Sequence, residues 1–201
     1  METAPDLSEF LSRVEDYLEL ALTADRTDGS GALDGDILIG AGRHLCIGGG
    51  GKRIRPLMVR LFADACGAPT DHLVEIGVAA ELVHSASLLH DDVVDGGMFR
   101  RGRPTVNARW GNIVAVMTGD LLLTIALTRL SAVDSSLTQE LIGTVAEMTR
   151  AAIAEVEARG DLSVSMNQLR SICEGKTGSL FAWCGIAPAL LARDADRKSV
   201  V

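Results

Sequence analysis

The sequence predicts a single all-α domain that occupies residues 1–201. Apolar residues recur at intervals of three and four, as in Phe10, Leu11, Val14 and Leu18, which is the spacing of an amphipathic helix. Strand signals are weak, because alternating β-branched residues are few and no Asn-Gly or Asp-Gly pair joins two apolar runs. The composition, with 47% hydrophobic and 23% charged residues, is that of a folded globular protein and excludes a mainly disordered chain.

Three helices are predicted in the first third of the chain. The first follows the apolar spacing over 7–18, and the second covers 33–45 and ends at the four glycines of 48–51. Pro56 suits the first turn of a third helix, because its fixed φ is already helical and its missing N–H has no partner there. This helix is predicted to end at Gly67.

The rest of the chain predicts further helices, for six to eight in total. The pair Thr70–Asp71 can cap a fourth helix that runs through Leu89, and an apolar helix follows over about 113–130. Ser136 and Ser165 each stand three residues before a glutamine, which is the spacing of a capping box. Both are therefore expected to begin helices.

The overall charge and the termini exclude several classes of protein. The net charge of −8 argues against nucleic acid as a partner. No uncharged stretch reaches the ~20 residues of a membrane span, and the N-terminus has no apolar signal region. The four cysteines show no metal-ligand spacing, which favours reduced thiols. We expect a cytoplasmic protein.

Positive charge gathers in two segments. Residues 40–63 contain five basic and no acidic residues, and residues 96–119 contain four basic and none acidic. Two basic segments in an acidic protein suggest a site for a small anion, although a solvated surface explains them as well.

The acidic sequence around Asp91 predicts a metal site. On a helix Asp91 and Asp95 share a face, whereas Asp92 is turned about 100° away. His84, about two turns earlier, lies near the same stripe. Aligned carboxylates repel one another, and a hard cation such as Mg²⁺ removes the conflict, typically with one or two carboxylates plus phosphate oxygens. A solvated acidic turn is the alternative.

The glycine-rich segment 50–56 predicts a phosphate site. Its glycines allow close approach of the backbone, and Lys52 and Arg55 offer a point charge and a planar fork to phosphate oxygens. The segment is not a Walker loop, since Cys46 and Arg53 stand where that motif requires glycine and Ser or Thr. A flexible loop with exposed basic residues is the alternative.

With these motifs the chain resembles the trans-type polyprenyl (isoprenyl) diphosphate synthases. Five motifs match in the family's order: GGKRIRP at 50–56, ELVHSASLLHDDVVD at 81–95, RRG at 100–102, TGDLLL at 118–123 and GKTGSLF at 175–181. The resemblance implies an isoprenoid-synthase-type helical bundle. It also implies a prenyltransferase that condenses isopentenyl diphosphate with an allylic diphosphate, using Mg²⁺ and acting as a homodimer.

The resemblance also implies roles for individual residues. Asp91 and Asp95 would hold Mg²⁺, with Asp92 as a secondary participant, and Asp91, Asp95 and Lys176 would be the catalytic residues. The residues implied to hold isopentenyl diphosphate are Lys52, Arg55, His84 and Arg101. Those implied to face the allylic diphosphate are Arg100, Lys176 and Thr177.

Product length is expected to depend on Ala86 and Ser87, just before the acidic motif. In the family that the chain resembles, bulky side chains at these positions limit the depth of the product pocket. Both residues are small here, which suggests a long-chain product.

One feature of the family is absent. No second Asp-Asp-x-x-Asp follows Asp95, so the chain is expected to be the N-terminal two-thirds of the family fold, truncated at the C-terminus. A non-catalytic partner subunit or an inactive remnant is the main alternative. A terpene cyclase is a third, although it would have no use for the second diphosphate site at 50–56.

Overall fold

The computed structural model describes residues 7–23, 36–47 and 50–199, and these residues confirm the predicted all-α fold. The N-terminal helices are α1 (Leu7–Ala21), α2 (Ile37–Cys46), α3 (Ile54–Cys66) and α4 (Leu73–Val94). The later helices are α5 (Val106–Trp110), α6 (Asn112–Ser131), α7 (Ser135–Glu157), α8 (Met166–Cys173), the π-helix η1 (Glu174–Gly178) and α9 (Ser179–Ser199). The predicted second-helix start at Leu33 and the glycines at 48–49 lie outside the described residues.

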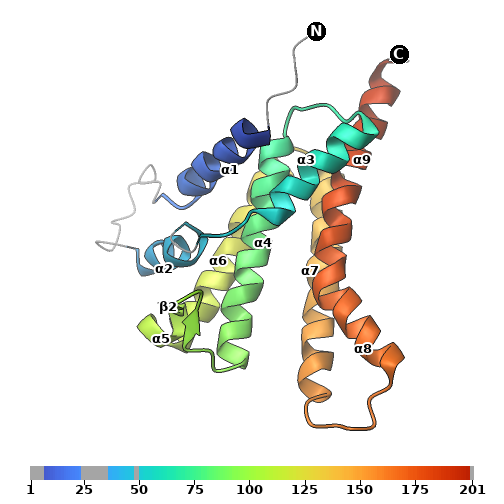
Figure 1. The fold of residues 1–201 in the computed structure, drawn as a ribbon. Coiled ribbons are helices and arrows are strands. Elements are labelled where there is room, and N and C mark those ends of the chain that lie inside the picture. Colours follow the sequence, from blue (N-terminus) through green and yellow to red (C-terminus); the bar gives the residue numbers. More distant parts are fainter. Residues whose placement is uncertain (1–6, 24–35, 48–49, 200–201) are drawn as a thin grey trace.

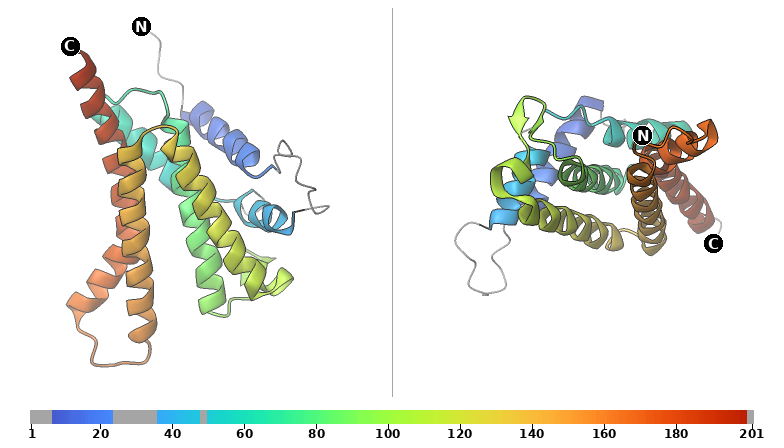
Figure 2. Two further views of the ribbon diagram at one scale, coloured as in Figure 1. Left: turned by 180° about the vertical axis from the view of Figure 1, so that it is seen from behind. Right: turned by 90° about the horizontal axis from the view of Figure 1, so that it is seen from below.

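Helix α4 is the centre of the core. It lies between α1 and α3 on one side and α6 on the other, while α9 packs against α3 and α4, and α7 against α6 and α9 (Figure 1 and Figure 2). Apolar side chains on several of its faces are fully buried, among them Ile76, Leu82 and Leu89. A helix that is apolar around most of its circumference is expected at such a position. The acidic motif is therefore part of the most extensively buried helix of the fold.

Of the three predicted helix caps, the structure confirms one and places the other two at different residues. Ser165 caps α8 in a full capping box, as predicted. Helix α7 is capped by Asp134 instead of Ser136, because the aspartate side chain accepts hydrogen bonds from the backbone two and three residues later. The predicted cap at Thr70–Asp71 is wrong: α4 begins after His72, which has φ of 67° and no side-chain cap.

A short hairpin, not predicted from the sequence, follows α4. Strands β1 (Phe99–Arg100) and β2 (Arg103–Pro104) pair antiparallel, with Phe99 opposite Pro104 (Figure 1). The two turn residues, Arg101 and Gly102, both have positive φ, which is the geometry of the tight turns that suit twisted hairpins. Two-residue strands are too short to show alternation in a sequence.

Two glycines allow helices to pack closely. A Cβ placed on Gly119 would lie 2.3 Å from Nε2 of His90, so this glycine gives the α4 histidine its place against α6. A Cβ on Gly175 would lie 2.8 Å from the Cβ of Ala151, so η1 rests directly on α7. The glycine of the motif at 118–123 thus serves packing between helices.

Two helices are long and apolar enough to cross a membrane, judged by length and composition alone. They are α4 and α6, whose most apolar windows are 72% and 33% buried within the structure. High burial of α4 is also expected of a core helix, so the absence of a membrane span stays a prediction. The four cysteines form no disulfide in the structure.

We predict that Gly175→Ala lowers the free energy of unfolding by about 1–3 kcal/mol, because the new methyl group must push η1 away from Ala151. The second-site change Ala151→Gly should restore part of this loss. The matched control is Gly143→Ala on α7, where a Cβ meets nothing within 4 Å and helix propensity should make the change neutral or stabilising. Urea denaturation of the four variants measures the coupling. Additive effects at Gly175 and Ala151 would contradict the contact.

Candidate active site

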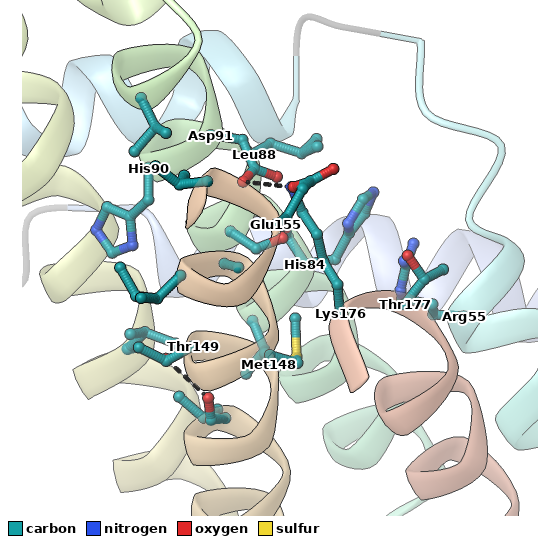
Figure 3. Close-up of a pocket in the computed structure, with 18 residues that line it drawn as sticks. Arg55, His84, Leu88, His90, Asp91, Met148, Thr149, Glu155, Lys176 and Thr177 are labelled. Atoms are coloured by element: carbon teal, nitrogen blue, oxygen red, sulfur yellow. Dashed lines mark hydrogen bonds and ion pairs between the residues drawn. The ribbon is translucent and has the colours of Figure 1, made fainter. Parts of the chain in front are cut away.

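A cavity of about 300 Å³ opens between α4, α6, α7 and η1 (Figure 3). This size is at the lower end of the range for small-molecule sites. One group of lining residues is polar or charged and includes Arg55, His84, Asp91, Glu155, Lys176 and Thr177. The apolar lining includes Val83, Leu88, Leu123, Val145, Met148 and Ile153. The cavity therefore suits an amphiphile with a charged head and an apolar tail.

An ammonium group joins two carboxylates at the polar end of the cavity. The Nζ of Lys176 lies 3.1 Å from Oδ1 of Asp91 and also donates a hydrogen bond to Glu155 (Figure 3). Burial lowers the pKa of Lys176, but the hydrogen bonds and charges of the two carboxylates outweigh this effect and raise it. Lys176 is thus a cation shared by the carboxylates of Asp91 and Glu155.

The π-helical turn η1 presents this lysine. Its wider turn interrupts the path from α8 to α9 and carries both Lys176 and Thr177, which line the cavity. Isolated π turns inside helices often lie at functional sites, because they redirect side chains without breaking the helix. Gly175, which precedes the pair, lets η1 lie close to α7.

The other two acidic residues of the motif have arginine partners. Asp95 forms an ion pair with Arg159, which lies two residues beyond the C-terminal end of α7. Asp92 is 6% exposed and accepts hydrogen bonds from Arg100, at 2.8 Å from Nη2 and 3.1 Å from Nε. Asp92 does not line the cavity that Asp91 lines. Its side chain is committed to the hairpin, in agreement with the predicted turn away from Asp91 and Asp95.

Arg55 brings positive charge to the cavity from the start of α3. Its guanidinium group lies 4.8 Å from the centre of the Phe181 ring, a cation–π contact, and its buried Nε has no hydrogen-bond partner. Burial lowers the pKa of Arg55, while the charge of Glu81 opposes the shift. A buried donor without a partner is costly.

His84 is a neutral imidazole in this setting. Burial, followed by the charges of Arg55, Arg101, Arg100 and Arg53, lowers its pKa from 6.5 to about 3. Its ring lines the cavity near Arg55. At neutral pH it can donate or accept a hydrogen bond but adds no positive charge.

The remaining predicted residues lie at varied distances from the cavity. Ser87 lines it, whereas Ala86 is fully buried in the core and does not. Lys52 is exposed on the glycine-rich loop. Arg101 lies close to that loop, since a Cβ on Gly51 would be 3.3 Å from its Nη1. Part of the predicted set thus meets in one cavity, and the rest surrounds it.

Sequence reasoning missed the contribution of α7. Glu155 lines the cavity and binds Lys176, and Arg159 pairs with Asp95. One signal was present: Val145, Met148 and Ala152 recur at helical spacing and lead to Glu155, which indicates a face that is apolar along most of its length and acidic at one end.

Comparison with known proteins decides the family. The sequence model described as polyprenyl synthetase matches residues 38–200, which is most of the chain. The chain belongs to the polyprenyl synthetase family.

Individual members of the family agree with this assignment. The chain is 34% identical over 158 residues to an all-trans-nonaprenyl-diphosphate synthase (geranyl-diphosphate specific) of Rhodobacter capsulatus, covering 78% of this chain and 48% of that protein. It is 38% identical over 148 residues to a (2E,6E)-farnesyl diphosphate synthase of Mycobacterium tuberculosis, covering 71% and 41%. This polyprenyl synthetase chain therefore spans about half the length of the curated relatives it matches.

A solved structure confirms the fold. A polyprenyl synthase from Caulobacter crescentus, complexed with calcium and isoprenyl diphosphate, superimposes with a TM-score of 0.82 at 27% identity. The match covers 96% of this chain and 58% of that one. The all-α isoprenoid synthase fold predicted from the motifs is thus confirmed.

The carboxylates of this polyprenyl synthetase chain fit a metal that is shared with a ligand. Within the described ranges, no three acidic, histidine or cysteine side chains converge to hold an ion by themselves. Asp91 lines the cavity and Asp95 lies one helical turn later. Two carboxylates can provide part of a Mg²⁺ shell when phosphate oxygens and water complete it.

We predict that His84→Gln weakens the acid sensitivity of folding. Because the pKa of His84 is about 3 when folded and about 6.5 when unfolded, the unfolded chain binds the extra proton between these values. The contribution of neutral His84 to the free energy of unfolding is fully present above pH 6.5 and is lost as the pH falls toward 3. The wild type should lose about 1–2 kcal/mol more than the variant between pH 7 and pH 5.

Urea denaturation at the two pH values measures this difference. A larger loss in His84→Gln than in the wild type would mean that the folded protein holds a charged histidine, contrary to its position among arginines.

Proposed function

We propose that the chain carries the substrate-binding and metal-binding residues of a Mg²⁺-dependent prenyltransferase that joins isopentenyl diphosphate to an allylic diphosphate. The observation that carries the proposal is the cavity, where carboxylates and cations meet at one end and apolar walls from α4 and α7 continue from it. Membership of the polyprenyl synthetase family supports the same reaction.

The two substrates would use different parts of the site. The allylic diphosphate would lie near Asp91, with Lys176 and Thr177 as its ligands from η1, and its hydrocarbon chain would run between α4 and α7. Isopentenyl diphosphate would be held by Arg55 and neutral His84, with Lys52 and Arg101 from the adjoining loops. Arg100 would act less directly, because its guanidinium group is bound to Asp92.

Asp91 and Asp95 would hold Mg²⁺, and Asp92 would keep its place through Arg100. The bound ion would supply positive charge to the leaving diphosphate. For the ion and the allylic diphosphate to enter, Lys176 must exchange its carboxylate partners for phosphate oxygens. Such an exchange would pair Asp91 with the metal ion and make Lys176 a ligand of the departing diphosphate.

The proposed reaction breaks one carbon–oxygen bond and forms one carbon–carbon bond. The C–O bond to diphosphate breaks, and its electron pair leaves with diphosphate. The double bond of isopentenyl diphosphate then supplies the electrons of the new carbon–carbon bond. Loss of a proton to the released diphosphate restores a double bond in the longer product. The apolar walls would keep water away from the allylic cation.

We also propose that the product is a long-chain polyprenyl diphosphate. Ser87 is small and lines the cavity one turn before Asp91, next to apolar residues such as Leu88 and Met148. A small side chain at this position would let a product chain extend beside α4. The relatives named above include both a farnesyl and a nonaprenyl synthase, so the length must be measured.

We further propose a cytoplasmic homodimer. Helix α6 supports an association between copies, since Ile113 and Met117 are 81% and 46% exposed on an otherwise apolar helix. An exposed apolar stripe of this kind favours contact with another protein surface.

We predict that the chain converts labelled isopentenyl diphosphate to a polyprenyl diphosphate only with an allylic diphosphate and Mg²⁺. Asp91→Asn should lower the rate by about 10²–10³-fold, because a ligand of the charge-neutralising ion is lost. The control Asp16→Asn changes an exposed aspartate on α1 and should leave the rate unchanged.

Other results of this assay would favour the alternatives. Turnover of the allylic diphosphate without isopentenyl diphosphate would indicate a terpene cyclase. Turnover only after addition of a second synthase would indicate a partner subunit.

We predict that Ser87→Phe shortens the products, because the ring fills the cavity beside α4. Ser87→Ala is the matched control, since it removes the hydroxyl group without filling space and should leave the products unchanged. Ala86→Phe is a poorer test, because Ala86 is fully buried and a ring there would overpack the core. Reverse-phase chromatography of the products measures the lengths. An unchanged distribution in Ser87→Phe would place the growing chain elsewhere.

A further inference from the structure

Arg53 is a basic residue of the glycine-rich motif that does not serve the cavity. It is 7% exposed, and it is absent from the cavity lining to which Arg55 belongs. Its guanidinium group is instead bound to three groups of the protein. This arginine therefore has a different role from Lys52 before it and Arg55 after it.

The partners of Arg53 come from three helices. Its Nε and Nη2 donate to the two carboxylate oxygens of Glu15 on α1, at 2.6 and 2.8 Å. Its Nη1 donates to Glu81 on α4 at 2.9 Å, and Nη2 also donates to the carbonyl oxygen of Cys46 at the end of α2, at 2.7 Å. A two-pronged arginine–carboxylate contact is strong and specific in direction.

One guanidinium group serves two carboxylates at this junction. Burial lowers the pKa of Arg53, but the hydrogen bonds and charges of Glu15 and Glu81 outweigh it and raise the pKa. Glu81 is 5% exposed and would be a costly buried charge without its arginine. The three side chains thus form one unit that ties α1, α2 and α4 together.

The backbone of Arg53 is held in an unusual conformation. It has φ of 49°, in the left-handed region that costs energy for a residue with a side chain, and it precedes α3 without any side-chain cap. Gly51 makes room for it, since a Cβ there would lie 2.7 Å from Nη1 of Arg53. Something must maintain this bend, and the anchored guanidinium group is in place to do so.

We propose that Arg53 is a positioning residue: its anchor on Glu15, Glu81 and Cys46 fixes the bend of the loop and so aims Lys52 and Arg55 at one diphosphate. Helix α1 then takes part in substrate binding through Glu15, although it contributes nothing to the cavity lining. The inference rests on the proposed diphosphate site and adds to it the residues that set its geometry.

The direction in which a charge change shifts anion binding distinguishes this positioning role from a purely electrostatic one. Removing the negative charge of Glu15 makes the surroundings more positive, which by Coulomb attraction should strengthen the binding of an anion. Loss of positioning should weaken binding instead. The two effects have opposite directions, so a single measurement distinguishes them.

The experiment titrates inorganic pyrophosphate into the 201-residue chain by calorimetry, with EDTA present so that only the basic residues are tested. Glu15→Gln should raise the dissociation constant about five- to tenfold. Glu19→Gln is the matched control, because it removes the same charge from an exposed position on the same helix. It should leave binding unchanged or slightly stronger. Arg53→Lys keeps the charge but loses the fork, and should weaken binding at least as much as Glu15→Gln.

Folding must be checked in parallel by circular dichroism. The side chain of Glu15 is 42% exposed, so Glu15→Gln is expected to fold, and it tests the proposal even if Arg53→Lys does not. Unchanged or tighter pyrophosphate binding in folded Glu15→Gln would overturn the positioning role. If the wild type itself fails to bind pyrophosphate while Mg²⁺-dependent turnover is present, the diphosphate site is placed wrongly and the positioning role falls with it. Absence of both binding and turnover would instead count against the proposed function.

Discussion

The ammonium group of Lys176, bound between the carboxylates of Asp91 and Glu155, is the interaction on which the candidate site depends. Charges in a partly buried cavity need partners, because water no longer screens them. Outside the cavity lining, Arg159 pairs with Asp95 and Arg100 with Asp92. Each of these carboxylates thus has a cationic partner before any ligand arrives. A metal ion with a diphosphate can replace these contacts only by offering equivalent charges, which favours ligands that carry both signs.

Helix α4 positions most of the side chains in this arrangement. One helix carries His84 and Asp91, which line the cavity, while Asp92 binds the hairpin and Glu81 binds Arg53. Burial of α4 against α1, α3 and α6 gives these side chains fixed directions. Helix α7 and the π-helical turn η1 then close the opposite side, where Gly175 allows direct contact with α7. The apolar walls follow from the same packing, so the cavity joins charged and apolar surfaces without a separate binding domain.

Most of the fold and much of the site could be predicted from the sequence. Helical spacing gave the all-α class, and spacing within the acidic motif correctly separated Asp92 from Asp91. The hairpin and the cap at Asp134 were missed, because two-residue strands and neighbouring cap candidates differ little in sequence. Glu155 and Arg159 were missed for another reason: their partners are 21 and 64 residues away, and only tertiary packing joins them. Arg53 and Arg55 look alike in sequence, but one is an anchor and the other lines the cavity.

The most direct test of this account is a crystal structure of the chain with Mg²⁺ and a non-hydrolysable farnesyl diphosphate analogue. We expect the diphosphate to lie beside Asp91, with Lys176 moved from Glu155 onto phosphate oxygens. We also expect the hydrocarbon chain to pass Ser87 between α4 and α7. A diphosphate bound elsewhere, or a chain outside this cavity while Lys176 stays on Asp91 and Glu155, would contradict it.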